Sequence, residues 1–183
     1  AKVKDSGTSV ELLSTDTVGP GVGAYLRTSA LKSILIALLL MLLYIAIRFK
    51  LAFSIGAVLA LFHDVLIIAA YFLLTRAEVS VDTIGAILMT LGYSINDTIV
   101  IFTNIRDNFS RMKGRPIDEI VNAGIQHTMK RTMLTSISTA LVVASLIAFG
   151  GESLRGLSVA LMIGIIFGTY SSVFIASPVM LMF

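Results

Sequence analysis

The sequence contains no cysteine and few charged side chains. The lack of cysteine excludes a disulfide framework, a thiol nucleophile and a cysteine-based metal site. Charged residues make up 14% of the chain, whereas a soluble domain carries roughly 25%. The surface therefore differs from that of an ordinary soluble domain, and we expect much of it to face lipid.

Motifs for nucleotide binding and for hydrolysis are also missing. The sequence has no glycine-rich P-loop, so nucleotide bound to this chain is excluded as an energy source. It has no Ser–His–Asp arrangement or aspartate pair that would suit an intramembrane enzyme. The net charge is +3, but no basic patch is interleaved with aromatic residues, which argues against a nucleic-acid partner. We predict a protein that is not an enzyme and that holds no metal or other cofactor.

Hydrophobic residues make up 56% of the chain and gather in long blocks. Five blocks each have nearly the ~20 residues that a helix needs to cross a bilayer. We predict an all-α integral membrane protein with five transmembrane helices. Re-entrant segments or buried helices of a soluble protein are the alternative. The predicted spans are residues 29–47, 51–74, 83–103, 132–151 and 156–183.

The positions of lysine and arginine predict how the chain is oriented. These residues gather in two connections, 48–50 and 104–131, whereas the other two contain only Arg76 and Arg155. Positively charged loops stay on the cytoplasmic side of a membrane. We therefore expect these two connections and the C-terminus inside, and the N-terminal tail outside.

Two segments outside the spans have patterns of their own. Residues 1–28 are polar, and we interpret them as the tail of a larger external domain, with a strand at 9–13 and a turn-rich connector at 18–23. Residues 116–130 carry an apolar stripe at helical spacing. This stripe predicts a short amphipathic helix that lies on the inner membrane surface or packs against the inner end of the bundle. The chain begins without methionine and stops in an apolar run, so we expect further segments at both ends.

Charged groups inside the predicted spans are the most informative residues. Placing one at the centre of a membrane helix costs about 2.5–3.5 kcal/mol, so such groups usually face the protein interior and often move ions. Asp97 lies well inside the third span, and we predict that it handles a proton. A static ion pair or a helix-packing hydrogen bond is the alternative. Its supporting polar neighbours on this span are predicted to be Tyr93, Ser94, Asn96 and Thr98.

Arg131 is the predicted partner of Asp97. It opens the fourth span at the cytoplasmic side, and Thr135 and Ser138 follow it as further supporting polar residues. The third and fourth spans run antiparallel, so we expect Asp97 and Arg131 at similar depths. Ordinary anchoring of a positive residue at the membrane edge is the alternative.

His63 and Asp64 are secondary candidates in the middle of the second span. Adjacent residues point about 100° apart on a helix, so we expect that these two do not share a contact. The same geometry argues against a metal site. We expect Asp64 to pair with a residue on another helix. The residues alone allow either a structural or a proton-related role.

Small residues at four-residue spacing predict close contact between helices. Gly164 and Gly168 form a GxxxG motif in the fifth span, and Gly56 and Ala60 form a looser pair in the second. Such pairs let helix backbones approach one another in a membrane.

Several longer segments occur together and in a fixed order. They are VGPGVG at 18–23, LFHDV at 61–65, GYSINDTIVIF at 92–102, NIRDN at 104–108, HTMKRTMLTSISTAL at 127–141 and FGG at 149–151. Together they resemble the SecF family over essentially the whole chain, and the runs in the third and fourth spans are the specific ones. The sequence departs from many relatives at Thr103 and Asn104, where they have Asp-Arg.

The resemblance implies one half of a resistance-nodulation-division (RND) transporter fold. The family has six membrane helices and an external α+β domain between the first two. This chain would then lack the first helix and most of that domain. The family's proton-pathway aspartate and functional arginine fall on Asp97 and Arg131.

The resemblance also implies a function and partners. Members associate with SecD, which supplies the other half, and join the SecYEG channel in the bacterial cytoplasmic (inner) membrane. There they use the proton-motive force to promote export of a translocating preprotein. YajC and YidC are further candidate partners, and membrane lipid surrounds the bundle. The coupling ion is expected to be H⁺, with Na⁺ as the alternative. Half of an RND-type exporter of small molecules or ions is the alternative function.

Overall fold

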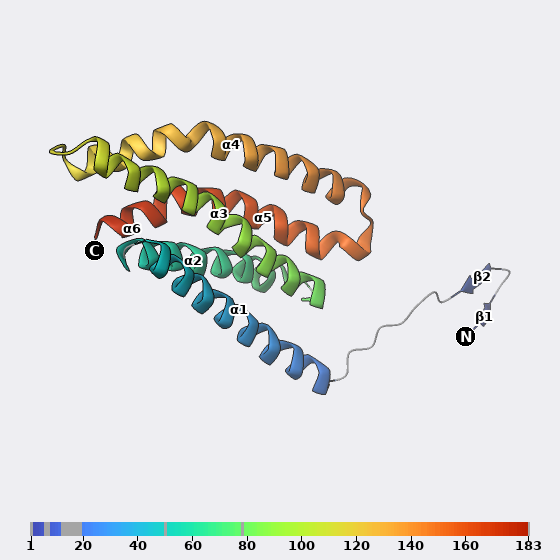
Figure 1. Cartoon of the computed structure of the whole chain (residues 1–183). Coiled ribbons are helices and arrows are strands. Elements are labelled where there is room, and N and C mark those ends of the chain that lie inside the picture. Colours follow the sequence, from blue (N-terminus) through green and yellow to red (C-terminus); the bar gives the residue numbers. More distant parts are fainter. Residues whose placement is uncertain (1, 6–7, 12–19, 50, 78, 183) are drawn as a thin grey trace. The chain divides into compact units, whose positions relative to one another are not determined.

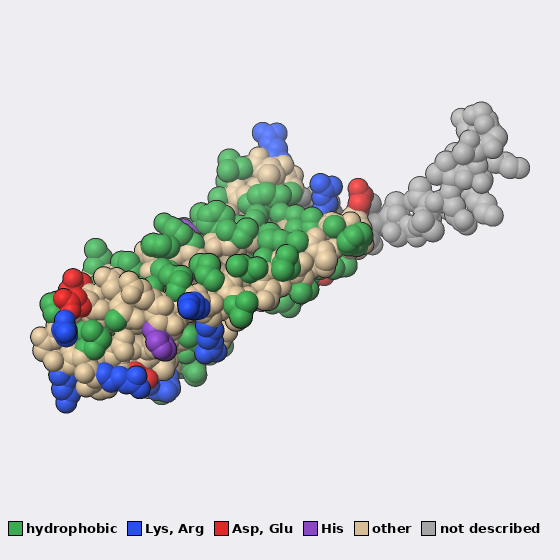
Figure 2. All heavy atoms as spheres, turned by 90° about the horizontal axis from the view of Figure 1, so that it is seen from above, with side chains coloured by type: hydrophobic (Ala, Val, Ile, Leu, Met, Phe, Trp, Pro, Cys, Tyr) green, Lys and Arg blue, Asp and Glu red, His purple; other side chains and the backbone are tan. Residues whose placement is uncertain are grey.

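Five of the described helices are long and apolar enough to cross a membrane, as the sequence predicts. In a bilayer the backbone must satisfy its own hydrogen bonds, which a helix does within one segment. Hydrophobic side chains cover much of the visible face, and charged side chains gather at the end that carries the α3–α4 connection (Figure 2). The computed structural model describes residues 2–5, 8–11, 20–49, 51–77 and 79–182.

The chain divides into two units, residues 1–32 and 33–183. Figure 1 labels most of their helices and strands. In chain order these are β1 (Lys2–Asp5), β2 (Thr8–Glu11), α1 (Pro20–Arg48), α2 (Leu51–Thr75), α3 (Val81–Arg111), α4 (Ile117–Phe149), a 3₁₀ turn (Glu152–Leu154), α5 (Arg155–Ser171), a π-helical segment η2 (Ser172–Ala176) and α6 (Ser177–Leu181).

The N-terminal unit differs in two respects from the prediction. It contains an antiparallel hairpin of β1 and β2, with Lys2 opposite Glu11, rather than one strand. The predicted strand overlaps β2, and its last two residues lie outside the described part. The predicted connector at 18–23 is wrong from Pro20 onward, because α1 begins there. Proline suits the first position of a helix, where its fixed φ is already helical and its missing N–H is not needed.

Helices α3 and α4 form a long antiparallel hairpin. They contain 31 and 33 residues, more than the ~20 that cross a bilayer. The predicted separate helix at 116–130 is therefore wrong, because these residues are the start of the continuous helix α4. This start packs against α3, because Gly124 brings its backbone close to Ile105. Of the two placements considered for this segment, packing against the bundle fits these contacts.

Small residues hold α5 against α3 and α6 against α2, as predicted. A Cβ atom added at Gly164 would lie 2.8 Å from the Cβ of Thr90, and one added at Gly168 would lie 3.1 Å from the Cβ of Ser94. One added at Gly56 would lie 2.5 Å from the carbonyl oxygen of Ala176, the last residue of η2, and 3.2 Å from the backbone nitrogen of Met180 on α6. Lipid tails are as apolar as these side chains, so close backbone packing takes over the role that hydrophobic burial has in water.

An aromatic cluster joins the α1–α2 connection to α3 at one end of the second unit. The rings of Phe49 and Phe102 lie 6.4 Å apart and nearly perpendicular, a favourable geometry. The guanidinium groups of Arg48 and Arg106 lie 5.4 and 5.3 Å from the centre of the Phe49 ring. The two arginine-bearing segments that the sequence places on one side of the membrane therefore meet at one aromatic ring.

The contact at Gly164 predicts a large loss of stability on a small substitution. Gly164→Ala forces its methyl group into Thr90, and overpacking of this kind costs about 1–3 kcal/mol. We expect a lower thermal unfolding temperature for the purified protein in detergent. Gly85→Ala on α3 is the matched control, because nothing lies within 4 Å of the added methyl group. Equal stability of the two variants would contradict the close contact of α5 with α3.

Candidate functional site

The carboxylate of Asp64 lies at a junction of three helices. Its side chain is 0% exposed and its Oδ2 atom accepts two hydrogen bonds. Ser94 of α3 donates at 2.6 Å and Ser171 of α5 donates at 2.9 Å. The predicted pairing of Asp64 with another helix is confirmed.

A glycine makes room for this junction. A Cβ atom added at Gly168 would lie 3.6 Å from Asp64 Oδ2 and 3.3 Å from Ser94 Oγ. The GxxxG motif on α5 thus does more than pack two backbones, because its second glycine lets the serine and the aspartate meet.

His63 contacts Asp64, which corrects the prediction from sequence. Its Nδ1 atom lies 3.2 Å from Asp64 Oδ1. The prediction considered the angle between adjacent Cα–Cβ bonds, but the two side chains are long enough to bend toward each other. The His63 side chain is 30% exposed. It therefore links the buried carboxylate to the surface of the bundle.

Asp97 forms a second buried site at the contact of α3 with α4. The residue is 5% exposed, and its Oδ2 atom has no hydrogen-bond partner among the described residues. Ser136 of α4 is its polar neighbour across the helix contact. The Ser136 hydroxyl lies 2.6 Å from the hydroxyl of Thr169 on α5 and accepts from the Tyr93 hydroxyl at 3.3 Å. Hydroxyls from three helices thus meet at Ser136, the polar neighbour of a carboxylate that is incompletely hydrogen-bonded.

Arg131 lies on α4 within electrostatic range of Asp97 but does not bind it directly. Its side chain is exposed, and none of the salt bridges within the described ranges joins it to Asp97. Its charge reaches Asp97 at longer range.

The predicted supporting residues separate into two groups. Ser94 and Tyr93 join the buried network, the first at Asp64 and the second at Ser136. The remaining four do not contact Asp97 by a described hydrogen bond. Thr98 donates to its own helix at Ser94, Asn96 is exposed, and Thr135 and Ser138 are exposed and donate to backbone oxygens of α4.

The predicted site residues do not include three members of the network, which are Ser136, Thr169 and Ser171. Hydroxyl side chains are common in membrane helices, and most of those described here bond to their own backbone. A single sequence therefore carries no signal that separates a hydroxyl that bonds another helix from one that bonds its own.

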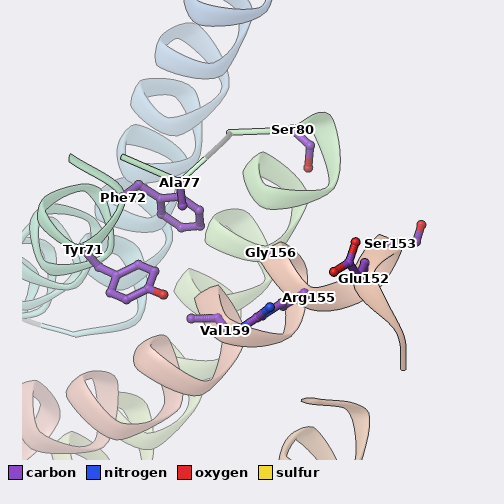
Figure 3. Close-up of a pocket in the computed structure, with 9 residues that line it drawn as sticks. All are labelled: Tyr71, Phe72, Ala77, Ser80, Glu152, Ser153, Arg155, Gly156 and Val159. Atoms are coloured by element: carbon purple, nitrogen blue, oxygen red, sulfur yellow. The ribbon is translucent and has the colours of Figure 1, made fainter. Parts of the chain in front are cut away.

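The structure also bears on a metal site and on a surface pocket. No group of three His, Cys, Asp or Glu side chains that could hold a metal ion occurs in the part of the chain that the structure describes. A pocket of about 460 Å³ lies where the end of α2, the connection between α2 and α3 and the start of α5 meet, and Figure 3 shows Tyr71, Ser80 and Arg155 around it. It contains none of the predicted site residues, so it is separate from the buried carboxylates.

Comparison with known proteins gives a consistent result. A family model described as "Protein export membrane protein SecD/SecF, C-terminal" matches residues 1–183. The chain is 48% identical to the protein translocase subunit SecF of Rhodothermus marinus over 95% of this chain and 58% of that protein. It is 43% identical to SecF of Vibrio alginolyticus over 98% of this chain and 57% of that protein. The chain thus spans little more than half the length of these relatives.

Solved structures agree with the sequence comparison. The crystal structure of SecDF, a translocon-associated membrane protein from Thermus thermophilus, superposes with a TM-score of 0.85 at 41% identity, over 90% of this chain and 23% of that chain. A SecDF structure in the super-membrane-facing form gives a TM-score of 0.81 at 39% identity, over 90% and 22% of the two chains.

The five membrane-length helices and these relatives make the chain part of a multi-pass membrane protein. Since the family model covers every residue and the relatives match nearly the whole chain, the chain belongs to the SecD/SecF family of protein export membrane proteins.

Proposed function

We propose that the chain is the membrane portion of a SecF-like translocase subunit that uses the proton-motive force to promote protein export. The observation that carries the proposal is Asp97, a buried carboxylate inside a membrane helix with one oxygen that lacks a partner among the described residues. The relatives named as protein translocase subunits support protein as the cargo. They do not favour the small-molecule exporter. In this role the chain is a transport component rather than an enzyme.

Asp97 is proposed to take up and release the coupling proton. A carboxylate in a membrane interior is costly when charged, so it is readily biased between its charged and neutral forms by its surroundings. Ser136 and Tyr93 are hydroxyls that can exchange hydrogen bonds as the charge of Asp97 changes, and Arg131 provides a positive charge at longer range. Na⁺ is the alternative coupling ion. Imposing a sodium gradient in place of a proton gradient on the same vesicles separates the two.

A second transmembrane half is proposed to dock on α3, with SecD as its source. One exposed face of α3 carries small and polar residues, which include Gly85, Gly92 and Asn96. An exposed amide is poorly suited to lipid, whereas small residues and amides suit contact with another helix. One related protein is named protein translocase subunit SecDF, so a single chain bears the names of both SecD and SecF. SecYEG, the translocating preprotein, YajC and YidC are proposed partners of the assembled complex.

The proposed setting is the bacterial cytoplasmic (inner) membrane, with the N-terminal tail outside and the C-terminus in the cytoplasm. Arg48 and Arg106 support this orientation, because they approach the same Phe49 ring and so mark one end of the bundle as positive.

Site-specific cross-linking tests the proposed docking face. The chain has no cysteine, so Asn96→Cys gives a single attachment point for a photoreactive maleimide. We expect a cross-link to SecD in native membranes, because Asn96 lies on the exposed polar face of α3. Leu141→Cys on the exposed apolar side of α4 is the control and is expected to label lipid. A lipid adduct without SecD at Asn96→Cys would refute the docking face.

The function itself is tested by export of a preprotein into energised membrane vesicles, with and without an uncoupler. Export that responds to the uncoupler equally with and without this subunit would contradict the proposal.

A further inference from the structure

We propose that His63 and Asp64 form a second proton-exchanging site, separate from Asp97. The hydrogen bonds that Ser94 of α3 and Ser171 of α5 donate to Asp64 change in strength with the charge of this site. The proposal deepens the proposed function, on which its part in transport rests. The observation that supports it is that the two carboxylate oxygens of Asp64 make different contacts.

The two oxygens of Asp64 have different surroundings. Oδ2 accepts from both serines, whereas the described partner of Oδ1 is His63 Nδ1 at 3.2 Å. A proton bound by Asp64 therefore belongs on Oδ1, where no hydroxyl already donates. The His63 ring is the partly exposed member of the pair, so protons reach the buried carboxylate through it.

The transfer needs no further reactant. His63 with a proton on Nδ1 takes a second proton at Nε2 and becomes an imidazolium. The Nδ1–H bond then breaks as an O–H bond forms at Asp64 Oδ1, which leaves a neutral imidazole and a carboxylic acid. Both groups are neutral after the step.

Charged groups on the neighbouring elements do not compete for this position. Asp97 on α3 has its polar neighbour on α4, and α5 carries a charge only at its first residue, Arg155. The sequences of η2 and α6 contain no charged residue. His63 is thus the titratable group that contacts Asp64 among the described residues.

The hydrogen bonding of Ser171 can change with the charge of Asp64, because the Ser171 hydroxyl has two acceptors. It lies 2.9 Å from Asp64 Oδ2 and 3.1 Å from the carbonyl oxygen of Gly168 on its own helix. A hydrogen bond to a charged oxygen is roughly twice as strong as one to a neutral oxygen. Protonation of Asp64 therefore weakens the first bond and favours the second.

The π-helical segment η2 begins at Ser172, directly after Ser171. Short π segments inside α-helices are frequent at functional sites. The weakening of the hydrogen bond from Ser171 to Asp64 therefore falls at the place where the helical register of the C-terminal segment changes.

Infrared difference spectroscopy after a pH jump tests the proposal on the full-length protein with its partner half in lipid vesicles. We expect a carbonyl band of a protonated carboxyl group that moves in D₂O, persists in Asp97→Asn and is lost in Asp64→Asn. Ser171→Ala should move this band to higher wavenumber, because Oδ2 then accepts one hydrogen bond fewer. Ser171→Thr, which keeps the hydroxyl, should restore it.

Asp64→Glu shifts the band without removing the carboxyl group, so the assignment stands even if Asp64→Asn does not fold. A pH difference spectrum that is the same in the wild type, Asp64→Asn and Asp64→Glu would overturn the proposal. The spectrum does not depend on export. Gradient-driven export without an Asp64 band therefore refutes this inference alone, whereas an Asp64 band without gradient-driven export refutes the proposed function alone.

Discussion

Asp97→Asn is expected to abolish the gradient-dependent part of protein export while insertion, folding and partner binding stay intact. Asparagine keeps the size and polarity of the side chain and can still bond Ser136, so the packing of α3 on α4 is preserved. It cannot take up or release a proton. The coupling step is therefore lost without loss of the structure that carries it.

The size of this effect follows from the energy of one proton. A charge that crosses 100 mV releases about 2.3 kcal/mol. Each 1.4 kcal/mol changes an equilibrium tenfold, so one proton biases two conformations by about fifty-fold. That bias does work if a group changes protonation inside the membrane and favours a different packing in each state.

The measurement is export into energised vesicles, with and without an uncoupler, for the wild type and Asp97→Asn. Asp107→Asn provides a matched control, because it makes the same chemical change on the same helix at an exposed position. We expect the control to keep the uncoupler-sensitive component. Asp97→Asn with a full uncoupler-sensitive component would make Asp97 a structural residue and remove the basis of the proposed function.

Arg131→Leu is expected to lose the uncoupler-sensitive component of export. Arg131→Lys is expected to retain part of this component. The charge of Arg131 acts on Asp97 from a distance, so lysine supplies much of its effect. Lysine lacks the planar fork with five donors, so we expect incomplete activity. The same vesicle assay, normalised to the amount of inserted protein, measures both variants.

Lys130→Leu distinguishes this role from anchoring at the membrane edge. Lys130 precedes Arg131 on α4 and is also exposed. If positive charge at this depth serves only to orient the chain, Lys130→Leu and Arg131→Leu will impair export and insertion to the same extent. A selective loss in Arg131→Leu supports a role at Asp97.

The sequence was sufficient to predict the spans because the signal is carried by many residues at once. A block of about 20 apolar residues fixes a membrane helix whatever its neighbours are. Helix ends depend on few residues, and there the predictions failed. Pro20 was assigned to a connector, although it begins α1, and the polar residues after Ile117 were taken as a separate helix, although α4 continues through them.

The charged residues of the buried sites could be predicted from the sequence, whereas most of their hydroxyl residues could not. Asp64 and Asp97 stand out because a carboxylate in an apolar block is rare. Ser171 is ordinary in sequence, and its contact with Asp64 joins residues 107 positions apart. The contact of His63 with Asp64 was not expected, because the angle between adjacent residues on a helix does not set where long side chains end.

The continuous α3–α4 hairpin has a mechanical consequence. From Asp97 to the end of α3 at Arg111 is a helical arm of about 21 Å, and α4 runs back beside it without a break. A stiff arm of this length converts a small tilt at the level of Asp97 into a larger displacement of the exposed turn at 112–116. Leverage in the opposite direction follows as well, so a force applied to this turn shifts the surroundings of Asp97.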